Sequence, residues 1–232
     1  MNITERTTVA AIASTLPSSV RVFQRHGIDF CCGGKTPLAT VCREHGIPFA
    51  ELVCAIEVSA LAAPDERDWN AEPLHLLIDH IIATFHDALR TELPRLESMA
   101  AKVARTHGLS AAYLARLDAI VSELSAELRS HMRKEELVLF PAIQTIEEGG
   151  VHRGIPIDMP IAVMEHEHDH AAALLSELRA ITNGYVPPPW ACETLRALYY
   201  GLSELEAAMH IHVHLENNVL FPRALVLAGI AA

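Results

Sequence analysis

One stretch of the sequence occurs twice, 81 residues apart. It reads HMRKEELVLFP from position 131 and HVHLENNVLFP from position 212. Each copy continues a series of apolar or special residues spaced by alternating steps of three and four, which runs from Leu114 to Val138 and from Leu195 to Val219. This spacing is typical of the buried seam of a helix in a bundle. Both copies are therefore predicted to end long amphipathic helices.

Two further segments carry weaker versions of the same pattern, at residues 82–96 and 161–178. No hairpin dipeptide lies between alternating Val, Ile or Thr runs, so strands are not expected. The sequence predicts an all-α fold, with an up-down four-helix bundle over residues 74–232. A polar, proline-bounded linker is expected at 63–73, after a small helical domain at 1–62 that is punctuated by Gly and Pro.

Charge and composition exclude several classes of partner. The chain has 18 Lys and Arg against 29 Asp and Glu, a net charge of −11, and so lacks the basic surface that attracts nucleic acids or anionic membranes. No run of about 18 apolar residues predicts a transmembrane helix. The N-terminal segment lacks a secretory pattern, and five cysteines do not form a disulfide framework. We expect a cytoplasmic protein.

Fourteen histidines are an unusual number for 232 residues, and four of them lie on the seams. Residues on antiparallel neighbouring helices lie at one depth when the turn is midway between them in the sequence. The midpoints between successive seam histidines fall at 108–109, 149–150 and 190, each within a separate Gly or Pro turn signal. One layer should therefore contain His86, His131, His168 and His212.

Two glutamates join this layer. Glu135 follows His131 by four residues, and Glu216 follows His212 in the same way, so each pair shares a helix face. Burying two carboxylates with no basic residue on the seam is costly unless a cation neutralises them. Six ligands suit two metal ions, each bound by two histidines and bridged by both carboxylates, and these donors favour iron or manganese. A lone seam histidine is more often an ordinary core residue, but this repeated arrangement is hard to obtain by accident.

Several residues near the six are not assigned as ligands. Four more histidines fall on faces that point away from the seam and are not expected to be ligands, namely His166, His170, His210 and His214. Glu127 lies one turn before His131, and Glu167 precedes His168. Both glutamates could line an approach to the metals or lie in the second shell, although solvated surface positions would also explain them.

The N-terminal domain contains a pair of adjacent cysteines followed by two glycines. Thr36 and Pro37 are a good cap and first helical residue, so the glycines should form a turn that presents Cys31 and Cys32 just ahead of a helix. The helix dipole and Lys35 would favour the thiolate. Alternatively, one thiol packs in the domain and the other is incidental. Buried positions are expected for Cys42, Cys54 and Cys192.

These motifs together resemble those of a known family. FCCGGK at 30–35, DHIIATFHD at 79–87, MEHEHD at 164–169 and the two repeat copies are similar to the iron-sulfur cluster repair di-iron proteins, the repair of iron centres family. That family combines a Cys-Cys-Gly-Gly domain with a hemerythrin-like bundle, and the resemblance covers nearly the whole chain. Its metal ligands fall on the six residues selected above.

The resemblance implies a cofactor and a function. The cofactor would be two non-haem iron ions, bridged by oxo and carboxylate groups, in a cytoplasmic homodimer. The function would be repair of iron-sulfur proteins damaged by nitrosative or oxidative stress, by iron delivery, with Cys31 and Cys32 as soft ligands or reductants. Two alternatives stay open. One is nitric oxide reduction to nitrous oxide, which would make the chain an enzyme, and the other is sensing or carriage of a diatomic gas.

Overall fold

A computed structural model describes residues 1–62, 67–150 and 156–230. The beginning of the predicted linker, 63–66, and the last two residues of the predicted bundle lie outside this range. The described residues form helices and no strand, apart from one isolated bridge between Thr8 and Pro37, so the all-α prediction is confirmed. The chain divides into two compact units, one of Met1–Ile78 with His210–Ala232 and the other of Asp79–Met209.

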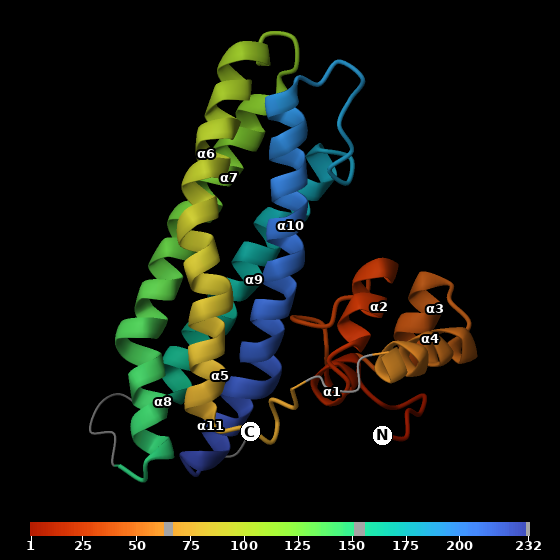
Figure 1. Ribbon diagram of the computed structural model, residues 1–232, viewed down its shortest axis with the longest axis vertical. Coiled ribbons are helices and arrows are strands. Elements are labelled where there is room, and N and C mark those ends of the chain that lie inside the picture. The colour runs from red at the N-terminus through yellow and green to blue at the C-terminus, as the bar shows by residue number, and fades with distance from the viewer. Residues whose placement is uncertain (63–66, 151–155, 231–232) are drawn as a thin grey trace. The chain divides into compact units, whose positions relative to one another are not determined.

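The N-terminal part of the first unit is a group of short helices around an apolar core. They are α1 (Val9–Thr15), α2 (Ser19–His26), α3 (Leu38–His45) and α4 (Phe49–Ala62). The rings of Phe23 and Phe30 stack in this core with centroids 6.2 Å apart, and Leu38, Leu52 and Ile56 are fully buried beside them. Figure 1 shows these helices in red to orange. The predicted small helical domain is present.

Two glycines are needed here for different physical reasons. Gly27 ends α2 in the left-handed conformation at φ +65°, where a side chain would meet nothing within 4 Å. Gly34 is limited by space, because a Cβ there would lie 2.7 Å from the carbonyl oxygen of Phe30 and 2.8 Å from the Cβ of Ala10. The Ala10 amide also donates to the Gly34 carbonyl at 2.8 Å. The turn after the cysteines is thus pressed against α1.

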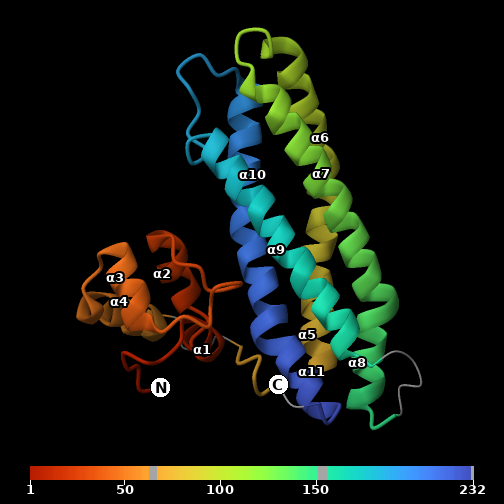
Figure 2. The ribbon, with the colours of Figure 1, turned by 180° about the vertical axis from the view of Figure 1, so that it is seen from behind.

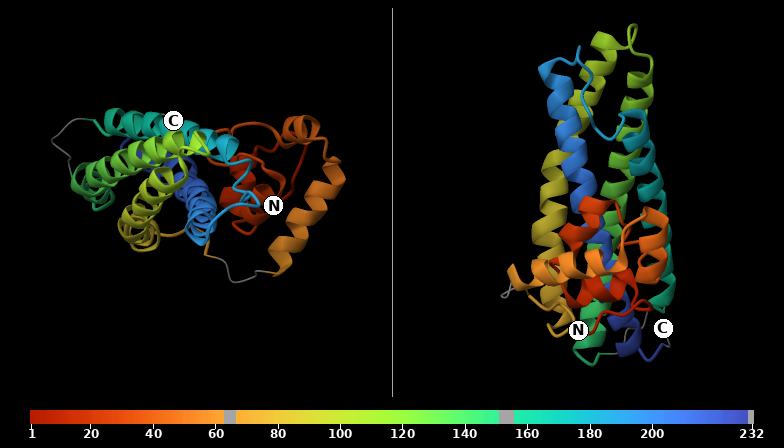
Figure 3. Two further views of the ribbon diagram at one scale, coloured as in Figure 1. Left: turned by 90° about the horizontal axis from the view of Figure 1, so that it is seen from above. Right: turned by 90° about the vertical axis from the view of Figure 1, so that its right-hand side faces the viewer.

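The second unit is an up-down four-helix bundle. Its helices are α6 (Asp87–His107), α7 (Tyr113–Lys134), α9 (Asp158–Ile181) and α10 (Glu193–Leu215, as far as Met209). Figures 1 and 2 show them side by side from opposite directions, and the left panel of Figure 3 shows them grouped when seen from above. The turns fall where the histidine midpoints predict, and the seams from Leu114 to Glu135 and from Leu195 to Glu216 are buried.

A π-helical turn interrupts three of the long helices. The continuous runs are α5 (Leu74–Ile81), η1 (Ile82–His86) and α6; α7, η2 (Glu135–Leu139) and α8 (Phe140–Glu147); and α10, η3 (Glu216–Leu220) and α11 (Phe221–Leu227). Each π turn ends or begins at a predicted ligand. π turns are rare and frequently occur at functional sites.

The π turns correct one detail of the predicted seam. The seam pattern includes Val138 as a buried position, but this side chain is 57% exposed, whereas Leu139 is 1% exposed. The wider turn that begins at Glu135 inserts one extra residue, which rotates the following side chains about the helix axis. The seam prediction at Val138 is therefore wrong.

In the part of the chain that the structure describes, no single helix is long and apolar enough to cross a membrane. Taken together, Leu38–His45 and Phe49–Ala62 are long and apolar enough, but a bend of 113° separates the two helices.

Replacement by Ala and by Asn should rank in opposite order at the two glycines, with Ala tolerated better at Gly34 and Asn tolerated better at Gly27. Gly34→Ala should lower the free energy of unfolding of the N-terminal helices by about 1–3 kcal/mol, and Gly34→Asn by more, because a larger side chain overpacks the contact with Ala10. At Gly27, Asn should be tolerated better than Ala because Asn adopts the left-handed conformation more readily. Hydrogen exchange of the buried amides in α1 and α3 measures both effects. Better tolerance of Asn than of Ala at Gly34 would contradict the packing argument.

Candidate metal centre

A fully buried carboxylate lies at the start of η2 in the second unit. Glu135 Oε2 is 3.4 Å from Nε2 of His86 on η1, and its Oε1 is 3.3 Å from Nε2 of His131 on α7. Within the described residues, neither oxygen of Glu135 accepts a hydrogen bond. A buried carboxylate without donors costs several kcal/mol unless a cation compensates for it. This position therefore fits a metal ion.

The outer nitrogens of both imidazoles are held by other carboxylates. His86 Nδ1 donates to Glu136 Oε1 at 2.7 Å, and His131 Nδ1 donates to Glu167 Oε2 at 2.9 Å. Because a carboxylate only accepts, the proton of each neutral ring is on Nδ1, and Nε2 turns a lone pair towards Glu135. Lone pairs facing a carboxylate repel it unless a cation lies between them. Metal-ligating histidines have this arrangement.

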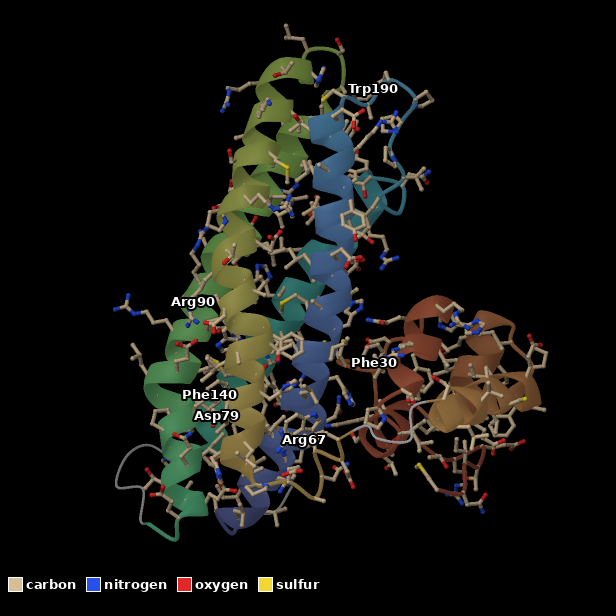
Figure 4. The ribbon with its side chains drawn as sticks, in the orientation of Figure 1. Phe30, Arg67, Asp79, Arg90, Phe140 and Trp190 are labelled. Carbon is tan, nitrogen blue, oxygen red and sulfur yellow. The ribbon has the colours of Figure 1, made fainter. Side chains whose placement is uncertain are left out.

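His168 from α9 completes the group within this unit. Its Nε2 lies 3.1 Å from Nε2 of His131, and the two ring centroids are 4.7 Å apart. His131, Glu135 and His168 are all buried and offer ligand atoms that lie within 4.8 Å of one another. The ring of His86 stacks on Phe140, which is labelled in Figure 4, with centroids 5.8 Å apart. The bundle thus contains buried His and Glu side chains suited to a metal ion.

Basic residues at the surface hold the outer carboxylates. Arg90, labelled in Figure 4, forms an ion pair with Glu136, and Lys134 forms one with Glu167. Burial raises the pKa of Glu167, but the hydrogen bonds from Lys134 and His131 outweigh it, so the pKa lies below its usual value. Glu167 therefore accepts the His131 proton as an anion at neutral pH.

Sequence reasoning missed Glu136. Its neighbour Glu135 carried the repeat pattern, whereas the contact of Glu136 with His86 spans 50 residues. The only sequence signal for a role of Glu136 is its position next to Glu135.

The two glutamates predicted to line an approach lie beside one cavity. This cavity has a volume of about 180 Å³, and its walls include Glu127, Glu167, His131 and His168. Glu127 is partly exposed and pairs with His170 at 3.0 Å. Both glutamates therefore lie where solvent approaches two of the predicted ligands.

The first unit holds the second copy of the repeat. His212, near the end of α10, and Glu216, the first residue of η3, are both fully buried, and His212 Nε2 lies 3.1 Å from Glu216 Oε1. His131 and Glu135 have the same relation, with Glu135 opening η2. The sequence repeat is thus also a repeat of local structure.

The additional histidines point elsewhere. His166 and His170 are exposed, while His210 and His214 pack their rings against Phe30 with centroids 6.2 and 5.6 Å away. Burial lowers the pKa of His214 to about 4 despite its hydrogen bonds to backbone carbonyls, so its ring is neutral at pH 7.

The cysteine loop is organised by Asp29. Its carboxylate accepts the amide hydrogens of Cys31, Cys32 and Gly33 at 2.9, 3.1 and 2.8 Å, and the Cys31 thiol at 3.3 Å. A hydrogen bond with the Cys32 side chain, burial and the negative charge of Asp29 all raise the pKa of Cys31. The prediction of a thiolate is therefore wrong for Cys31.

Other details of the cysteine predictions also change. Pro37, not Thr36, is the N-cap residue, and α3 begins at Leu38. Cys31 is buried and Cys32 is half-buried. Cys42 is buried as predicted, but Cys54 is exposed and Cys192 is half-buried, so burial was wrongly predicted for Cys54.

Comparison with known proteins places this geometry in a family. Residues 77–224 match the hemerythrin HHE cation binding domain, and residues 5–60 match ScdA_N, described as a domain of unknown function. A protein named iron-sulfur cluster repair protein YtfE from Pectobacterium atrosepticum is 42% identical over 214 residues, 92% of this chain and 94% of the relative. Proteins of the same name from Cronobacter sakazakii and Escherichia coli O139:H28 are 43% and 41% identical with the same coverage.

The chain belongs to the iron-sulfur cluster repair protein family. In this iron-sulfur cluster repair family member, the predicted ligands from His86 to Glu216 all fall in the hemerythrin HHE domain, which implies iron binding. Cys31 and Cys32 fall in the ScdA_N domain.

The contact between His86 and Glu136 gives a prediction for metal affinity. Glu136→Gln should weaken iron binding about 10- to 100-fold, because the amide orients the His86 ring poorly and adds no negative charge behind it. Competition with a chromophoric chelator measures the change. Glu148→Gln, at an exposed glutamate, is the matched control and should bind iron as the wild type does. Equal affinity of Glu136→Gln and the control would show that Glu136 has no such role.

Proposed function

We propose that six residues of this iron-sulfur cluster repair family member bind two iron ions. They are His86, His131, Glu135, His168, His212 and Glu216. Support comes from the buried His and Glu side chains that each unit contributes: His86, His131, Glu135 and His168 in one unit, and His212 and Glu216 in the other.

The continuity of α10 also supports this set. The helix runs without a break from Glu193 to Leu215, and Met209 is a buried seam residue of the bundle. His212 follows Met209 by three residues and therefore continues the same face. The repeat offers a second argument, because His212 and Glu216 have the same local arrangement as His131 and Glu135.

The chemistry of the six donors favours iron. Imidazole and carboxylate suit a metal of intermediate hardness, and the hemerythrin HHE match points in the same direction. When bound, iron would supply redox chemistry and exchangeable coordination positions. The protein contributes the two carboxylates and the ring orientations set by Glu136 and Glu167.

We infer that the chain repairs iron-sulfur clusters damaged by nitrosative or oxidative stress, and that it does so by delivering iron. The observation that carries this inference is the buried Glu135 carboxylate between two imidazole lone pairs, in a chain whose relatives are named iron-sulfur cluster repair proteins. Two carboxylates supply only two negative charges against the four positive charges of a ferrous pair. Thiolates and sulfides of a damaged cluster neutralise iron more fully, which favours transfer to the cluster.

The partners in this proposal are damaged iron-sulfur proteins. Cys32 is half-buried and is better exposed than Cys31, so we assign it the contact with iron in transit. The cytoplasmic location and the homodimer stay predictions from the family resemblance.

Iron stoichiometry tests the site. After anaerobic reconstitution, the wild type should hold two irons per chain, and the double variant Glu135→Ala with Glu216→Ala should lose more than half, because both bridging carboxylates are gone. A control pair at exposed glutamates, Glu123→Ala with Glu148→Ala, should keep two. Less than one iron in the wild type, or retention of more than half in the double variant, would overturn the dinuclear site.

Cluster repair tests the function. Wild type loaded with ⁵⁷Fe should restore an aconitase-type dehydratase inactivated by nitric oxide, and the label should appear in the restored cluster. The glutamate double variant should restore little activity. Equal restoration by free ferrous iron at the same concentration would count against delivery. Stoichiometric nitrous oxide from the reduced chain, without labelled clusters, would favour nitric oxide reduction instead.

A further inference from the structure

An asparagine on η3 binds the backbone of the cysteine loop. The Asn218 Nδ2 group lies 3.2 Å from the Phe30 carbonyl oxygen and 3.1 Å from that of Cys31. It also lies 3.1 Å from His214 Nδ1, which itself is 3.3 Å from the Phe30 carbonyl oxygen. Phe30, labelled in Figure 4, packs its ring edge against His214.

The loop is therefore bound on two sides. Asp29 accepts the amide hydrogens of Cys31, Cys32 and Gly33, while Asn218 donates to the carbonyl groups of Phe30 and Cys31. Phe30 and Cys31 are 1% and 6% exposed, so water has little access to these carbonyls. Without the Asn218 amide, two shielded acceptors would lose a donor.

The same helical segment carries two of the proposed iron ligands. His212 and Glu216 are four residues apart, and His214 and Asn218 form a second pair displaced by two residues. Two residues correspond to a rotation of about 200°, so the pairs lie on opposite faces. The segment from α10 into η3 thus presents iron ligands on one face and binds the cysteine loop with the other.

The first copy of the repeat shows what this second face looks like without a loop to bind. The residue equivalent to Asn218 is Leu137, which is 65% exposed, and the residue equivalent to His214 is Arg133, which is also exposed. The two copies have the same residue types at His131 and Glu135 as at His212 and Glu216. The replacement of an exposed leucine by an asparagine thus coincides with the contact to Cys31.

We propose that Asn218 is a positioning residue for the repair reaction. Its amide fixes the Cys31–Cys32 loop on the segment that carries His212 and Glu216, so the thiols and the iron ligands keep one spatial relation. This inference rests on the proposed repair function and assigns to it a residue that touches neither iron nor a thiol.

Two variants of the full chain test the proposal. Asn218→Ala removes the amide, and Asn218→Asp keeps its size but replaces the donor with a carboxylate that repels the carbonyls. Both variants should keep two irons per chain and the wild-type absorption spectrum. Iodoacetamide should alkylate Cys32 at least fivefold faster than in the wild type, as followed by mass spectrometry. The maximal rate of cluster repair should fall at least fivefold, with the half-saturating client concentration within twofold of the wild-type value.

Asn70→Ala is the matched control. This asparagine belongs to the same unit, and within the described residues it forms hydrogen bonds with Ser14 and Asp68 rather than with the cysteine loop. The control should leave alkylation, iron content and repair unchanged. It separates the loss of any asparagine-to-carbonyl bond from the loss of this one.

Three results would overturn the proposal. Loss of iron in parallel with repair would show that Asn218 supports the metal site in general. Faster alkylation with full repair would show that the fixed loop is not needed, and unchanged alkylation would show that Asn218 does not fix it. If the wild type repairs no cluster, the proposed function fails, while the alkylation and iron measurements still decide whether Asn218 fixes the loop.

Discussion

A buried carboxylate that finds no hydrogen-bond donor among the described residues is the constraint on which the surrounding bundle depends. Glu135 faces the lone pairs of two imidazoles, and this arrangement is stable only with a cation between them. The outer contacts follow from it. Glu136 and Glu167 hold the Nδ1 protons, which fixes the tautomers, and Arg90 and Lys134 then compensate for the charge of these carboxylates at the surface. Metal binding and stability of the bundle should therefore be coupled.

The π turns allow one helix to carry both the proposed ligands and the core residues that follow them. A helix that presents His and Glu four residues apart to the centre would, in regular α geometry, continue with its next inward positions at steps of three and four. The extra residue in η2 shifts that phase, so Leu139 and Phe140 are buried and Val138 is exposed. The apolar run after each glutamate thus supplies core residues on the far side of the turn, and the ligand layer does not interrupt the packing.

The helix order could be predicted and the six proposed ligands could be selected, because both depend on local periodicity and on the positions of turns. The depth argument needed only the spacing of seam histidines. The π turns could not be predicted in this way, because the series of threes and fours continues through Val138 and Val219 without a break. Glu136 was missed because its partner His86 lies on another helix, and such pairing has no local signal.

The cysteine loop shows a similar limit. The helix dipole and Lys35 are visible in the sequence as stabilising charges, and the thiolate was expected from them. Asp29 was visible too, but its effect depends on the turn geometry that brings its carboxylate to 3.3 Å from the Cys31 thiol. At that distance a negative charge acts more strongly than the more distant partial charge of a helix end. The raised pKa of Cys31 thus depends on the hydrogen bond with Cys32, on burial and on the charge of Asp29, all of which only the folded loop creates.

The two copies of the repeat share the residues proposed to bind metal and differ in the residues on the opposite helix face. Both copies have His, Glu and the following Val-Leu-Phe-Pro, and both form a π turn at the glutamate. Val138 is exposed while its counterpart Val219 is 2% exposed, because the second copy belongs to the unit that also contains the N-terminal helices. A segment that must bury both faces has no solvated side. Its polar residues on the face opposite the ligands therefore need partners inside the protein, and the backbone of the cysteine loop is the partner found there.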